Sequence, residues 1–145
     1  VELLQKRGPN HVDTIKMRRR EIIEINFKKL PVYTNFFNNG TLENFRLIPR
    51  GVVYKLEPKD WNAYHELKET NDKIWNTYET RGLDKIYYES DLNKIPLFYS
   101  AILNNLSSIF WNAGFKEEAV KFLEKAIGIN PNYELARTNL KKIKK

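Results

Sequence analysis

The chain has no cysteine among its 145 residues, and it has only six glycines and six prolines. The absence of cysteine excludes disulfides, thiolate nucleophiles, iron–sulfur clusters and cysteine-ligated zinc. The scattered glycines form no phosphate-binding loop. No stretch approaches the roughly 18 consecutive apolar residues that indicate a membrane-spanning helix. No signal peptide is recognisable either. Because the chain begins at Val1 rather than at methionine, we expect it to be part of a longer protein.

Histidine is scarce as well, with His11 and His65 as the two copies. A zinc site needs three or four converging ligands, and neither histidine belongs to a spacing that would supply them. Glu117 and Glu118 are consecutive on a predicted helix, so their carboxylates point in different directions and form no acid–base pair. We therefore expect a non-catalytic chain with no metal and no small-molecule cofactor.

The residues that are abundant are hydrophobic, aromatic and basic. Hydrophobic residues make up 41% of the chain and aromatic residues 13%, which is enough for a core in one domain or two small units. The formal net charge is +7, with basic clusters at Arg18–Arg20 and at residues 141–145. These clusters are either solvated surface or contacts to phosphate, in nucleic acid or an anionic membrane surface. Because no aromatic residues interleave with them, nucleic-acid binding is only the alternative function.

Residues 1–59 are predicted to form a small unit of one helix and short β-strands. Apolar periodicity predicts a helix over 12–30, which Pro31 ends. Asn38-Asn39-Gly40 is typical of a tight hairpin turn. Three stretches rich in β-branched and aromatic residues are predicted strands: 32–37, 45–48 and 51–56.

Residues 60–145 are predicted to be helical. Asp60 is a suitable N-cap for a helix that runs to about Thr80, and Gly82 suits the position after its end. The predicted fold class is therefore α+β, mainly α: a small N-terminal helix-plus-β unit packed on a helical region.

The C-terminal helical pattern resembles one tetratricopeptide repeat over residues 100–133. Gly114 falls at the turn between two helices, and Pro131 closes the unit. Six apolar positions match those that pack one helix on the other: Leu103, Leu106, Phe110, Ala119, Leu123 and Ala126. Residues 134–145 look like the cap helix of such a repeat. Its buried side is predicted to carry Leu135, Ala136, Leu140 and Ile143.

This resemblance implies a scaffold that binds a protein or peptide along its first helix. By it, four residues would face the partner: Asn104, Ser108, Trp111 and Asn112. Trp111 is the candidate anchor, because Phe110 already fills the packing position beside it. The alternative is that one repeat forms no groove and this face is buried against the predicted Trp61–Thr80 helix.

A second resemblance involves residues 21–56. Three segments, Glu21–Asn26, Lys28–Tyr33 and Leu47–Leu56, are similar to the soluble C-terminal tail of bacterial multi-spanning proteins related to protein O-mannosyltransferases. Leu30 stands where that family tends to have arginine. The resemblance implies a domain that follows the last membrane helix, on the extracytoplasmic face of a bacterial membrane, with transferase chemistry elsewhere in the parent protein. Without such a parent, we expect a cytoplasmic protein.

Overall fold

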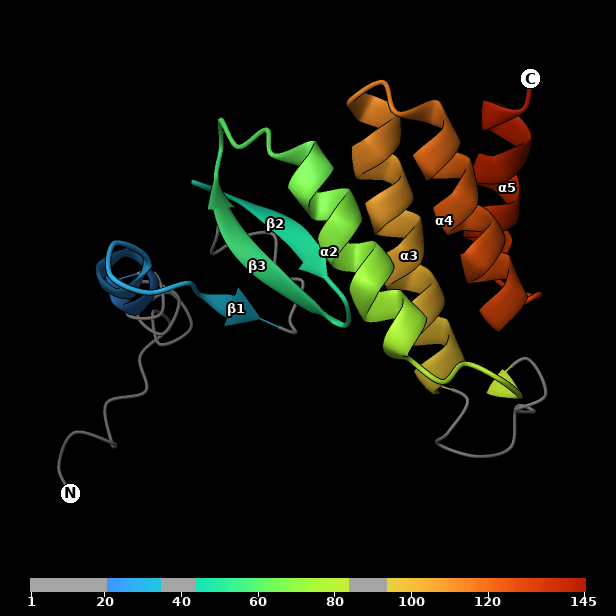
Figure 1. Ribbon diagram of the computed structural model, residues 1–145, viewed down its shortest axis with the longest axis horizontal. Helices are drawn as coiled ribbons and strands as arrows, with labels where there is room; N and C mark the ends of the chain where they lie inside the picture. The colour runs from blue at the N-terminus through green and yellow to red at the C-terminus, as the bar shows by residue number, and fades with distance from the viewer. Residues whose placement is uncertain (1–20, 35–43, 84–93) are drawn as a thin grey trace, which may run out of the picture. The chain divides into compact units, whose positions relative to one another are not determined.

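The computed structural model describes residues 21–34, 44–83 and 94–145 (Figure 1). The chain is mainly helical with a small three-stranded antiparallel sheet, which confirms the predicted fold class. Two compact units are present. The described part of the first comprises 21–34, 44–48 and 53–61, and that of the second comprises 49–52, 62–83 and 94–145. The predicted division between residues 59 and 60 stays a prediction.

The first unit contains a short helical stretch and most of the sheet. Residues 21–27 are helical and end in a turn ahead of Pro31, while residues 12–20 of the predicted helix lie outside the described residues. The Phe27 and Phe45 rings meet edge to face, with centroids 4.7 Å apart. None of the helices in the described ranges is long and apolar enough to cross a membrane.

The sheet has the strand order β1-β3-β2. Its strands are β1 (Tyr33–Thr34), β2 (Phe45–Arg50) and β3 (Val53–Pro58). β1 runs antiparallel to β3, with Tyr33 opposite Lys55 and Thr34 opposite Tyr54. The rest of the predicted 32–37 strand beyond Thr34 and the predicted turn at 38–40 lie outside the described residues.

Pro49 was predicted to separate two strands, and that prediction is wrong. The proline lies inside β2, which is an edge strand of the described sheet. An edge position tolerates proline because its missing N–H group need not pair with a neighbouring strand. The strands separate instead at Gly51, whose φ of 63° is a left-handed conformation that favours glycine.

Helix α2 (Tyr64–Thr77) belongs to the second unit and is shorter than predicted. Its N-cap is Ala63, with no side-chain cap, so the predicted N-cap Asp60 is wrong. Asp60 lies instead within a turn that is closed by a hydrogen bond from the Trp61 N–H to the Pro58 carbonyl. The helix ends at Tyr78, whose backbone is extended, so Gly82 is not its terminating residue.

Asn71 of α2 fixes the turn at residues 49–52. Its Nδ2 donates to the Pro49 carbonyl at 2.9 Å, and its Oδ1 accepts from the Gly51 N–H at 3.1 Å. The Asn71 side chain is fully buried, and Nδ2 also donates to the Leu67 carbonyl. A Cβ atom at Gly51 would lie 2.6 Å from Cγ2 of Ile74, so glycine is needed here for space as well as for its φ.

Helices α3 (Lys94–Asn112) and α4 (Lys116–Ile129) form the hairpin in which the repeat resemblance falls. Gly114 has a φ of 86° at the turn between them. All six predicted helix-packing residues are buried, from Leu103 on α3 to Ala126 on α4. The hydroxyls of Ser100 and Ser107 donate to α4 carbonyls at 2.8 Å, so these buried polar groups are satisfied.

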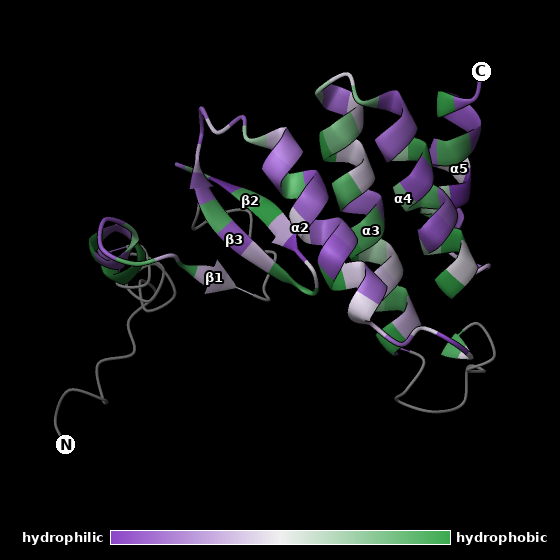
Figure 2. Ribbon diagram, viewed as in Figure 1, coloured by the Kyte–Doolittle hydropathy of each residue, from purple (hydrophilic) through white to green (hydrophobic). Residues whose placement is uncertain are grey.

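Helix α5 (Glu134–Ile143) follows α4 and packs on it through a narrow stripe of buried residues. Ala136 and Ile143 are buried, whereas Leu135 is 51% exposed, so its predicted place on the buried side is wrong. Consecutive residues on a helix point about 100° apart, so Leu135 points away from the narrow stripe that holds Ala136 and Ile143. Figure 2 shows many hydrophilic residues on α5, in contrast to the largely hydrophobic or neutral α3.

Candidate functional site: a pocket lined by α3 and α5

A pocket of about 220 Å³ lies in the second unit. Residues of α3 and α5 line it: Ser107, Ser108, Trp111, Asn112, Asn139, Lys142 and Ile143. Small-molecule sites usually begin at roughly 300 Å³. The pocket is therefore of a size that suits one or two side chains of a partner better than a cofactor.

Three of the four residues predicted to bind a partner line this pocket. Ser108, Trp111 and Asn112 lie three and four positions apart on α3 and therefore share one face. Trp111 is 44% exposed, while its neighbour Phe110 is fully buried and stacks on Phe122 with centroids 5.5 Å apart. The helix thus presents the Phe110 ring to the core, as predicted, and the Trp111 ring to the pocket.

The fourth predicted residue, Asn104, does not line the pocket and is only 3% exposed. Its Oδ1 accepts a hydrogen bond from Asn139 Nδ2 at 2.9 Å. Its backbone carbonyl accepts one from the Ser108 hydroxyl at 3.1 Å. Asn104 therefore holds two pocket residues in place instead of presenting its own amide to the surface.

Sequence reasoning missed the contribution of α5. Asn139, Lys142 and Ile143 complete the pocket, although the sequence assigned this helix only a capping role. The sequence did hold one indication of this contribution. Asn139 follows Asn104 by 35 positions, which is close to the length of one repeat, so the two asparagines occupy nearly equivalent positions on α3 and α5.

The face of α3 that carries these residues is open to solvent. Trp111 and Asn112 are both exposed, so this face is not buried against α2, which was the alternative drawn from the sequence. Lys142 is the one charged residue among those that line the pocket. The pocket therefore offers an aromatic surface, amide and hydroxyl groups and an ammonium group, with no carboxylate for acid–base chemistry.

The described ranges offer no metal-binding cluster. No group of three or more histidine, cysteine, aspartate or glutamate side chains is placed to hold a metal ion there. The His65 ring packs edge-on against Phe115, with centroids 5.4 Å apart, which is a structural contact. His11 lies outside the described residues.

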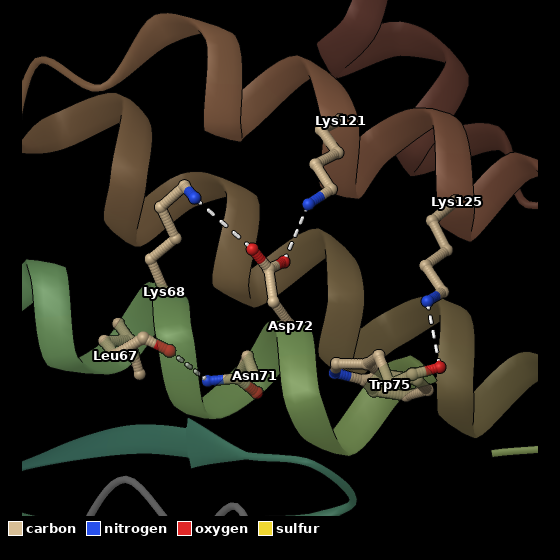
Figure 3. A network of polar contacts seen from close by, with 7 residues as sticks. All are labelled: Leu67, Lys68, Asn71, Asp72, Trp75, Lys121 and Lys125. Atoms are coloured by element: carbon tan, nitrogen blue, oxygen red, sulfur yellow. Dashed lines mark hydrogen bonds and ion pairs between the residues drawn. The ribbon is translucent and has the colours of Figure 1, made fainter. Parts of the chain in front are cut away.

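A second group of polar contacts joins α2 to α4 (Figure 3). Asp72 on α2 forms ion pairs with Lys121 on α4 at 2.7 Å and with Lys68 at 3.3 Å. Burial alone would raise the pKa of the Asp72 carboxyl, but the hydrogen bonds and charges of these two lysines outweigh burial and lower that pKa. Asp72 is therefore ionised at neutral pH and fixes α4 against α2.

Comparisons of this chain with protein-family models, curated proteins and solved structures found no match.

Proposed function

We propose that this chain is a non-catalytic protein-interaction domain of tetratricopeptide type that binds an extended segment of a partner protein in the α3–α5 pocket. The observation that carries the proposal is that Ser108, Trp111 and Asn112, chosen by the repeat resemblance, line one pocket with the tryptophan exposed. A half-exposed tryptophan beside a pocket is typical of residues that dominate binding energy.

The polar groups of the pocket suit a peptide backbone. Asn112 and Asn139 each carry amide donors and an acceptor, which can pair with the carbonyl and N–H groups of an extended chain. Asn104 holds Asn139 through a 2.9 Å hydrogen bond, so that amide is positioned before a partner arrives. Such preorganisation reduces the entropy that binding must overcome.

Peptides displayed on phage are a suitable probe, because the partner is unidentified. A pool selected on the full chain would be measured against Trp111→Ala and against Phe98→Ala. Phe98 is a matched control, since it lies on the same helix, is 40% exposed and does not line the pocket. Circular dichroism would verify that both variants keep their helices.

We expect Trp111→Ala to weaken peptide binding by at least about tenfold, as a central aromatic anchor should, and Phe98→Ala to leave it unchanged. Equal losses in the two variants, or no selectable peptide, would contradict the proposal. Binding of a single-stranded RNA oligonucleotide that falls steeply with salt would favour the alternative of a nucleic-acid-binding module instead.

We further propose, from the resemblance of residues 21–56, that the chain is the soluble C-terminal domain of a bacterial multi-spanning membrane protein. The coding sequence upstream of Val1 tests this. Several apolar stretches of about 20 residues would support it. A start codon a few residues upstream would contradict it and leave a free-standing repeat protein.

A further inference from the structure

The cations of α5 differ in whether the chain itself neutralises them. Arg137 forms an ion pair with Glu134 at 3.0 Å, and Lys144 forms one with Glu124 at 2.9 Å. Lys142 is exposed, and no carboxylate of the described ranges forms an ion pair with it. Lys142 therefore lines the α3–α5 pocket with a positive charge that the described part of the chain leaves unbalanced.

The hydrogen-bond donors that remain in the pocket suit a carboxylate. Both serine hydroxyls already donate to carbonyls of the chain, and the Asn139 amide gives one N–H to Asn104 and keeps the other. The amide of the exposed Asn112 and the ammonium group of Lys142 are the further donors. An ionised carboxylate accepts at both oxygens, and it forms its strongest hydrogen bonds with charged donors. A basic side chain would instead meet the like charge of Lys142.

The charges around the pocket favour the same kind of partner. Residues 141–145 include four lysines, of which Lys144 is the one paired with Glu124. The chain as a whole has a formal net charge of +7. Such an excess attracts an acidic segment to this end of α5 and makes its association sensitive to ionic strength.

The size of the pocket limits the spacing of side chains in the partner. A pocket of about 220 Å³ accommodates one or two side chains, with Trp111 lining it from α3 and Lys142 from α5. In an extended segment, side chains two residues apart point to the same side, roughly 7 Å from each other. One apolar side chain and one acidic side chain at this spacing can therefore occupy the pocket together.

We propose that the pocket selects an acidic partner segment, in which an aspartate or glutamate stands two residues from an apolar side chain. The carboxylate pairs with Lys142, and the apolar side chain packs on Trp111. This inference rests on the proposed function, because it names the class of partner that the α3–α5 pocket binds.

Peptides selected on the full chain are the probe, displayed on phage through their C-termini so that every carboxylate under selection is a side chain. We expect an acidic residue at a fixed spacing of two from an apolar one. In synthetic peptides, changing that acid to its amide should weaken binding about fivefold, as titration calorimetry would measure. Selected peptides without a shared acidic position would overturn the inference, and so would tight binding that requires a free C-terminal carboxylate.

Lys142→Gln is the matching change in the chain, and Lys141→Gln is its control. Both lysines are exposed in the last turn of α5, but Lys141 does not line the pocket. We expect Lys142→Gln to weaken binding of the acidic peptide about fivefold and Lys141→Gln to weaken it less than about twofold. The amide form of the peptide should bind wild type and Lys142→Gln equally, because the ion pair is already lost. Equal losses in the two variants would mean that no specific pair forms and would overturn the inference.

Failure of this inference and failure of the proposed function give different results. Peptides that depend on Trp111 but keep their affinity for Lys142→Gln would overturn the acidic partner and leave the interaction domain in place. Peptides whose binding is unchanged by Trp111→Ala would overturn the proposed function and this inference with it. The substitution in the peptide decides the matter if Lys142→Gln fails to fold.

Discussion

The second unit has two kinds of helix contact, and they differ in what remains available to a partner. Between α3 and α5, an exposed tryptophan and two asparagines surround an open pocket of about 220 Å³. Between α2 and α4, Asp72 pairs with Lys121, and Lys125 donates to the Trp75 carbonyl. An exposed aromatic side chain beside an open pocket can still gain contacts when a partner binds. Ion pairs that are already satisfied within the chain stabilise the second unit itself.

The sharpest test of this comparison is a pair of neighbouring aromatic substitutions. Phe110→Ala should lower the free energy of unfolding by about 3–5 kcal/mol, because the buried ring leaves a cavity beside Phe122. Trp111→Ala should lower it by less than about 1 kcal/mol, because nearly half of its surface is already in water. Urea unfolding followed by circular dichroism measures both. Similar losses would mean that Trp111 belongs to the core and is not a binding residue.

Two asparagines give a second, smaller contrast. Asn71→Leu should reduce stability by about 2–3 kcal/mol, because it leaves the Pro49 carbonyl and the Gly51 N–H unpaired in a buried site. Asn139→Leu should cost about 1 kcal/mol or less, since the hydrogen bond of Asn139 to Asn104 is only partly buried, yet it should weaken peptide binding. Thermal unfolding and peptide titration of the same two samples would show the difference. A loss of peptide binding only in Asn71→Leu would contradict the assignment of the α3–α5 pocket as the binding site.

The ion pair at Asp72 gives the smallest effect, and its pH dependence has a definite sign. The pKa of this carboxyl is lowered in the folded state, so its contribution to stability is fully present above the ordinary value of 3.8. That contribution is lost as the pH falls through the lower folded value. Asp72→Asn should therefore cost up to about 1 kcal/mol at pH 7 and progressively less in acid.

Urea unfolding of wild type and Asp72→Asn between pH 7 and about pH 2 would measure this difference. Glu134→Gln is the matched control, because it removes an exposed ion pair with Arg137 within α5. We expect the control to have the smaller effect. A stability difference for Asp72→Asn that stays constant down to acid pH would show that the ion pairs do not cause it.

Local patterns in the sequence predicted the α3–α4 hairpin well. Helical spacing of Leu103, Leu106 and Phe110 identified the buried face, and Gly114 marked the turn. The same spacing separated Phe110 from Trp111, because adjacent residues on a helix point in different directions. Features that depend on the spacing of apolar residues and on turn residues, within one or two neighbouring helices, can thus be predicted from the sequence.

The features that escaped prediction depend on residues far apart in the chain. Asn139 reaches Asn104 across 35 positions, and Lys125 reaches the Trp75 carbonyl across 50. The start of α2 after Asp60 and the place of Pro49 inside β2 were likewise set by the surrounding structure against the local preference. No periodicity or motif encodes such contacts, so the α5 half of the pocket and the setting of Lys125 emerged only with the structure.

The most direct test of the interaction claim is to map a phage-selected peptide on the chain by NMR, with amide chemical shifts recorded before and after its addition. The account predicts that the largest changes fall on Ser108, Asn112, Asn139 and Lys142, while Lys68, Asp72, Lys121 and Lys125 do not change. Changes concentrated on the α2–α4 residues, with the pocket residues unaffected, would contradict it.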